Sequence, residues 1–227
     1  MTITSTTLTR ASGVAAAVAG LLFIGVQISH PTLDAEFATT TEYTFRESVK
    51  ILMAVLSLIG ITGMYLRQVT QSGVLGLLGY LVFGAGYLVL LSIQIIGVFV
   101  LPFLATTSPD YVSDVLVAAV APTDGDIGPM KLLFQLSGIT FLAGGFLFGI
   151  ALFRARVLAR WAAALLAGAA IATVATSLIP QLNPRLFAIP VGIAMIGLGY
   201  SLWRRSGNAQ RTELSSAVSP LDPAGAK

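Results

Sequence analysis

The chain contains no cysteine and only one histidine, His30. The lack of cysteine excludes disulfides, thiolate metal sites, CxxC redox chemistry and a cysteine nucleophile. A single histidine cannot supply a pair of haem ligands or a histidine-rich metal site. The sequence therefore predicts a protein without a metal centre and without a bound cofactor.

Charged residues are also scarce. Only 10% of the 227 residues are Asp, Glu, Lys or Arg, whereas 56% are hydrophobic, and the mean hydropathy is +0.87. An average soluble domain carries roughly 25% charged residues, so this chain has too few to cover a surface that faces water. We expect lipid to be its solvent and the bilayer its main partner. The net charge of +3 gives no indication of nucleic-acid binding.

Six segments are long and apolar enough to cross a bilayer core of ~30 Å, which takes about 20 helical residues. The predicted fold is all-α: a polytopic membrane domain over residues 1–205, with six transmembrane helices and a short outer interfacial helix. Residues 206–227 are rich in Ser, Ala and Pro, and we expect a disordered cytoplasmic tail there. The predicted spans are 12–30, 49–66, 74–101, 132–153, 157–179 and 186–203.

Basic residues lie mainly on one side of this predicted topology. With the N-terminus in the cytoplasm, nine are inside and four outside, all in short loops or tails. This is the positive-inside bias that orients multi-pass membrane proteins. We therefore expect a plasma-membrane protein with both termini in the cytoplasm. The inner set is Arg10, Arg67, Arg154, Arg156, Arg160, Arg204, Arg205, Arg211 and Lys227.

The segment FRARVLARW, residues 153–161, is the predicted cytoplasmic turn between the fourth and fifth spans. Arg154, Arg156 and Arg160 would each cost about 2.5–3.5 kcal/mol at the centre of a membrane helix. We therefore interpret them as anchors that hold two helix ends at the interface. A second interpretation is a binding site for an acidic lipid headgroup.

The outer connection at 105–131 predicts the short interfacial helix. Ser108 is a suitable N-cap and Pro109 fits the first helical position. Four apolar residues then follow at helical spacing on one face; they are Val112, Val115, Leu116 and Ala119. Asp124 and Asp126 lie in a predicted solvated turn, because the acidic positions of a calcium loop are not repeated there.

Three glutamines fall in one predicted layer, in the outer third of the bilayer. They are Gln27, Gln94 and Gln135. An unpaired amide in hydrocarbon costs several kcal/mol, so these side chains should face one another or a wet cavity. We consider two hypotheses. One is an outward-open polar pocket bordered by His30, Glu47 and Lys50, and the other is hydrogen bonding between helices, at about 0.6 kcal/mol per contact.

Other motifs predict packing rather than chemistry. Glycines such as Gly76, Gly79 and Gly86 permit close approach of membrane helices. A Ser–His nucleophile would require His30 near Ser137, although His30 belongs at the outer end of the first span. A proton- or sodium-coupled transporter usually buries a carboxylate near the midplane, and none of the ten acids falls in a predicted span.

Four segments carry a resemblance to a broad group of bacterial multi-pass membrane proteins that is common in actinobacteria. They are GLLFIGVQISHP (20–31), LSLIGITGMYLRQ (56–68), GLLGYLVF (76–83) and FGIALFRARVLARWAAALL (148–166). The resemblance implies a six-helix bundle in the bacterial plasma membrane. It implies no reaction and supplies no catalytic residues.

The sequence favours a membrane protein without enzymatic activity, such as an accessory or small-ligand-binding subunit. A second hypothesis is a small permease or channel for a neutral or weakly polar solute, which would need a continuous polar path. A third is an intramembrane enzyme, which would need a nucleophile with a base, or a metal. No set of residues in the sequence supplies either of these.

Overall fold

The computed structural model describes residues 4–27, 33–121, 123–176 and 188–218, with side chains as far as residue 173 in the third range and 205 in the last. Within these residues the structure consists of helices and turns, without strands. The helices are α1 (Ser5–Gly25), α2 (Ala35–Ala38), α3 (Thr41–Arg67), α4 (Val69–Phe99), α5 (Leu101–Thr107), α6 (Pro109–Ala118), α7 (Met130–Ala155), α8 (Arg160–Thr176) and α9 (Ala188–Val218).

Four of these helices, α1, α3, α4 and α7, are long and apolar enough to cross a membrane. The prediction of an all-α protein of membrane type is thereby confirmed. The fifth predicted span corresponds to α8, which has 17 residues and is shorter than the usual ~20. The predicted ends of the first, fifth and sixth spans touch residues outside the described ranges.

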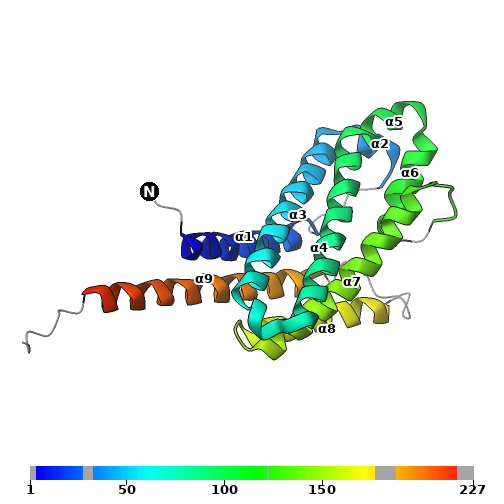
Figure 1. Cartoon of the computed structure of the whole chain (residues 1–227). Coiled ribbons are helices and arrows are strands. Elements are labelled where there is room, and N and C mark those ends of the chain that lie inside the picture. Colours follow the sequence, from blue (N-terminus) through cyan, green and yellow to red (C-terminus); the bar gives the residue numbers. More distant parts are fainter. Residues whose placement is uncertain (1–3, 28–32, 122, 177–187, 219–227) are drawn as a thin grey trace, which may run out of the picture.

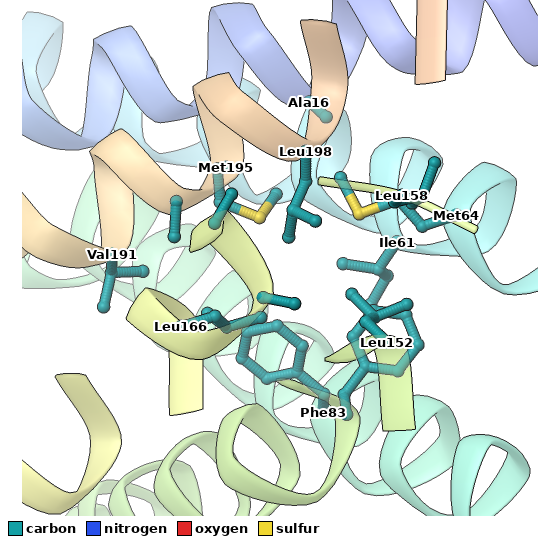
Figure 2. Close-up of a cluster of buried hydrophobic side chains, with 14 of the residues drawn as sticks. Ala16, Ile61, Met64, Phe83, Leu152, Leu158, Leu166, Val191, Met195 and Leu198 are labelled. Carbon is teal, nitrogen blue, oxygen red and sulfur yellow. The ribbon is translucent and has the colours of Figure 1, made fainter. Parts of the chain in front are cut away.

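The long helices form two layers that cross at a steep angle (Figure 1). The first layer contains α3, α4 and α7, in which α4 contacts both neighbours. The second contains α1, α8 and α9, in which α9 contacts both neighbours. Contacts of α1 with α3 and of α7 with α8 join the layers. Figure 2 shows the shared core, where Phe83 and Leu152 of the first layer lie near Leu166 and Met195 of the second.

Glycine permits the closest helix contacts. On α1, a Cβ atom at Gly13 would lie 2.8 Å from the carbonyl oxygen of Gly199 on α9, and Gly20 meets Gly192 in the same way seven residues on. Between α4 and α7, glycine and phenylalanine alternate in three antiparallel pairs, so that each glycine meets the backbone of a phenylalanine. These pairs are Gly79–Phe148, Phe83–Gly144 and Gly86–Phe141. Small residues at these positions let backbones approach, which is how membrane helices associate.

A small cap closes the end of the first layer that lies away from the α7–α8 turn (Figure 1). It consists of α2, α5 and α6, whose apolar side chains form a second core with the adjoining ends of α3, α4 and α7. The short helix predicted in this connection is present as α6, with Pro109 at its start and Val112, Val115 and Leu116 buried; its position at the membrane interface stays a prediction. Ser108 precedes α6 but makes no capping hydrogen bond with its side chain, contrary to expectation.

Two helix ends differ from the prediction, because hydropathy reports contact with lipid rather than helix length. The helix α3 begins at Thr41 rather than near residue 49, since the Thr40 hydroxyl caps it by accepting from the Tyr43 N–H at 3.1 Å. At the other end of the chain, α9 extends to Val218, past residue 206, where the predicted tail begins; the disorder of the tail stays a prediction. Pro220 follows two residues later, and the residue before a proline disfavours helix.

The third predicted span also ends differently. It becomes α4 with a separate α5, because the helix stops at Phe99 and α5 starts at Leu101 with Pro102 in its first turn. Near its other end, α4 is interrupted at Gly73, where φ is 56° and ψ is −153°. Such an angle pair is open to glycine and strained for other residues.

Candidate functional site

Polar residues lie on the buried face of α3. Its buried positions alternate four and three residues apart, which keeps them on one side of a helix. At the cap end this face carries Tyr43 and Glu47, with Lys50 one turn further along, and then Ser57 in the middle of the helix. Helical spacing alone therefore brings several polar groups to the contact between α3 and α4.

Glu47 is the centre of this arrangement. Glu47 is only 7% exposed, and its Oε1 atom accepts a hydrogen bond from Lys50 Nζ at 2.5 Å. A Cβ atom added to Gly97 on α4 would lie 3.4 Å from Glu47 Oε2 and 3.3 Å from the Tyr43 hydroxyl. Gly97 thus leaves room for both polar groups beside the α4 backbone. Phe37 from α2 packs edge-to-face against the Tyr43 ring at 5.6 Å and covers the site from the cap.

Gln94 lies at about the same height along the α3–α4 pair as Lys50. The helices α3 and α4 run in opposite directions, so one turn inward from the Glu47–Gly97 contact leads to Lys50 on α3 and to Gln94 on α4. Both residues are half-buried. The cap ends of these two helices therefore place a carboxylate, an ammonium group, a phenol and an amide within about two helical turns, or roughly 11 Å. We call Tyr43, Glu47, Lys50 and Gln94 the outer polar site, after the side of the membrane on which the predicted topology places it.

The other predicted pocket residues are not part of the outer polar site. Gln135 is exposed on α7, and Gln27 is half-buried just after α1. His30 lies outside the described residues. Among the described residues, none of the three glutamines forms a side-chain hydrogen bond. A shared pocket for all six predicted residues therefore stays a prediction.

Sequence reasoning missed Tyr43 and Gly97, and it placed Glu47 in a loop. The spacing of residues 43, 47, 50, 54 and 57 alternates between four and three. It therefore extends the helical pattern of the apolar run back toward the start of α3. Tyr43 carries no charge and Gly97 has no side chain, so neither attracts attention in a search for titratable groups.

Polar groups continue along the α3–α4 contact toward the α7–α8 end. The hydroxyl groups of Ser57 and Tyr87 are buried near each other, but neither completes a hydrogen bond within the described part of the chain. Further along, Thr62 Oγ1 and the Tyr80 hydroxyl are 3.1 Å apart, and the Tyr80 ring stacks on Tyr65 at 4.7 Å. This row of polar groups lies at the contact between α3 and α4, within the first layer.

A small apolar cavity lies deeper in the molecule, between α4, α7, α8 and α9. Its volume is about 10 Å³, which is close to the lower limit for one water molecule. Its lining is Phe83, Phe141, Leu142, Gly145, Leu166, Ala170, Thr173 and Val191. Thr173 gives its hydroxyl hydrogen to the Ala169 carbonyl oxygen, so the cavity supplies little polar recognition.

Acidic residues of the cap form a turn rather than a cluster of metal ligands. Asp114 Oδ1 accepts from the Thr123 hydroxyl at 3.4 Å, and Asp126 Oδ1 accepts from the Gly128 N–H at 3.0 Å. Over the described ranges, no group of three or more His, Asp or Glu side chains is placed to hold a metal ion. Ser137, the nucleophile considered above, is buried on α7.

The predicted anchors Arg154, Arg156 and Arg160 lie together at the α7–α8 turn, and all three are exposed. Arg156 ends α7 in the left-handed conformation, with φ at 58°. The Arg160 guanidinium lies over the Phe153 ring, 4.2 Å from its centroid.

No protein-family model, curated protein or solved structure matches the chain.

Proposed function

We propose that this protein is a non-enzymatic, ligand-binding membrane subunit that receives a small polar ligand at the outer polar site. The observation that carries the proposal is the buried carboxylate of Glu47, paired with Lys50 beside Gly97. Burying the Glu47 carboxylate costs several kcal/mol, so its pairing with the half-buried Lys50 contributes little net stability. Ionisable residues within membrane helices mark functional sites by default.

The chemistry of the site indicates the class of ligand. The Lys50 side chain is 26% exposed, whereas that of Glu47 is 9% exposed, so the ammonium group is the accessible partner. A ligand with a carboxylate and an amine, or a comparable dipole, can bind Lys50 and Glu47 in place of their mutual contact. Gln94 and Tyr43 add a neutral amide and a hydroxyl. We therefore propose a small zwitterionic solute.

The proposal includes six transmembrane helices, α1, α3, α4, α7, α8 and α9, in a bacterial plasma membrane, with both termini in the cytoplasm and the cap outside. The distribution of charge supports this orientation. The described acidic side chains all lie in the cap or next to it, including Asp34, Glu36 and Asp110. Basic residues such as Arg67 and Arg154 lie at the opposite end of their helices, as positive-inside topology requires.

Ligand-dependent thermal stability of the purified protein tests this function. We expect at least one solute from a panel of small zwitterions, amines and carboxylates to raise the Tm of the wild type, because a ligand that binds only the folded state adds about 2.7 kcal/mol at a hundredfold excess over Kd. The shift should be lost in Glu47→Gln. It should be kept in Glu42→Gln, which makes the same charge change at an exposed position of α3.

A panel without any shift, or a shift of equal size in Glu47→Gln and wild type, would contradict the proposal. The polar row at Ser57, Tyr87, Thr62 and Tyr80 favours one alternative, a permease for a weakly polar solute. Uptake of the bound solute into proteoliposomes separates the two functions. A binding subunit binds without uptake, whereas a permease gives uptake that Glu47→Gln abolishes.

A further inference from the structure

We infer that the α7–α8 turn binds the headgroup of an acidic phospholipid. The turn carries Arg154, Arg156 and Arg160 within seven residues, and all three side chains are exposed. The ion pairs found among the described residues, Arg46–Glu42 and Lys50–Glu47, both lie at the cap end. Three guanidinium groups therefore gather at one end of the bundle without a described protein anion to neutralise them.

The turn is held in a fixed shape. Leu158 is 2% exposed and belongs to the shared core, and the Ala159 N–H donates to Ser201 Oγ on α9 at 3.0 Å. The Trp161 ring packs over Gly197 of α9, where a Cβ atom would clash with the indole. With Leu158 in the core and Ala159 and Trp161 held against α9, the backbone of the turn loses little freedom on binding, which favours affinity.

The chemistry of the turn suits a phosphate group attached to acyl chains. Arginine binds phosphate through two parallel N–H donors. The first N–H groups of α8 also point out of its start at Arg160 and favour an anion there. Trp161 is 59% exposed, as expected for an aromatic ring at headgroup depth. Exposed apolar residues of α8, such as Ile171, offer a surface for the chains, which a free phosphate ion would not use.

The same end of the molecule provides a matched control. Arg67, Arg204 and Arg205 are also exposed, but they lie at the end of α3 and in the middle of α9 rather than in the turn. Replacing these three residues removes the same charge from the same side of the protein. Replacing either set would weaken a diffuse attraction to an anionic surface equally. A defined site at the turn would be weakened only by replacing Arg154, Arg156 and Arg160.

Tryptophan quenching by brominated lipids tests the site. The chain has two tryptophans, so Trp203→Phe leaves Trp161 as the reporter beside the turn. The variant is reconstituted in phosphatidylcholine vesicles that contain brominated phosphatidylglycerol or, separately, brominated phosphatidylcholine. We expect the anionic lipid to be favoured at Trp161 by roughly fivefold, the contribution of about one basic residue near a surface.

In the same background, Arg154→Gln, Arg156→Gln and Arg160→Gln together should bring this preference close to one, whereas the Arg67, Arg204 and Arg205 set should preserve it. Equal quenching by the two lipids before any arginine is changed overturns the inference, and so does an equal loss in both triple variants. If the first triple variant fails to insert, Arg156→Gln is compared with Arg204→Gln, and equal preferences then overturn it. The outcome of this quenching test does not depend on whether a ligand binds at the outer polar site.

Discussion

Alternating glycine and phenylalanine residues determine how closely α4 and α7 approach. A Cβ atom at Gly79 would lie 2.5 Å from the backbone nitrogen of Phe148, and Gly144 meets the backbone of Phe83 in the same way. Lipid tails are as apolar as these side chains, so close packing rather than the hydrophobic effect associates the helices. Each methyl group added at these positions must push two backbones apart.

Gly144→Ala should therefore destabilise the protein by about 1–3 kcal/mol, the usual cost of overpacking. The control is Gly138→Ala on the same helix, where no atom lies within 4 Å of the added Cβ. There we expect no loss, because alanine is the better helix former by about 1 kcal/mol. Equilibrium unfolding by SDS in mixed micelles measures both. Equal stabilities would show that the helix contact is not as close as described.

Glu47 shows how much of the site the residue types alone predict. Its charge, and that of Lys50, indicated a polar border at the outer mouth of the bundle. Their pairing with each other depends on α3 starting about two turns before the apolar run. Gly97 as the opposing surface depends on the register between α3 and α4, which no local pattern specifies.

At the scale of the helix, the break in α4 at Gly73 separates its first turn from the rest. The backbone angles there are strained for any residue with a Cβ atom. Space is not the constraint, because no atom lies within 4 Å of the position that a Cβ would take. The break therefore depends on backbone conformation alone.

Gly73→Ala should cost about 1–3 kcal/mol, the range for a residue forced into a sparsely populated conformation. Gly168→Ala on α8 is the matched variant, since its site is equally open and its φ angle is not positive. SDS unfolding should show a loss for Gly73→Ala only. If both variants retain wild-type stability, the helix can straighten at this position without cost.

Apolar runs predicted which segments become helices far better than where the helices end. Hydropathy responds to the lipid-facing middle of a helix, so the polar first two turns of α3 and the extension of α9 to Val218 were invisible to it. The cap helix α6 was predictable because a proline start and a periodic apolar face coincide in ten residues. Partner choice was not predictable, since glycines indicate close contact but not which helix makes it.

For the whole molecule, the crossing of the two layers constrains how it sits in a bilayer. At ~1.5 Å per residue, α3, α4 and α7 are about 39–46 Å long, whereas α1 and α8 are about 25–31 Å long. The hydrocarbon core is ~30 Å thick. Both layers cannot stand upright. In the second layer only α9 is as long as α4, and it carries Arg204 and Arg205 about halfway along, so the apolar length to spare belongs to the first layer. We therefore expect α3, α4 and α7 to tilt more, with their surplus length in the cap.

Reporter fusions test the orientation of the whole chain. Fusions at Gln71, at Arg156 and at the C-terminus should report the cytoplasm, because the basic residues there resist translocation. Fusions at Thr40 and Asp124 should report the outside. Alkaline phosphatase and a fluorescent protein give opposite signals for each site and serve as mutual controls. An inside signal from Asp124 would contradict the six-span topology or its direction.

The pairing of Gly13 with Gly199 and of Gly20 with Gly192 also constrains the order of biogenesis. Among the described helices, α1 is synthesised before the others, and its main partner α9 is synthesised after them. At about 5–20 residues per second, the 171 residues between Gly20 and Gly192 take roughly 9–34 s to synthesise. Of the described helices that contact α1, α3 alone is present during this time, and it contributes Gly60 against Ala16. A chain that stops before residue 188 leaves the glycine face of α1 open to lipid, so arrival of α9 completes the second layer.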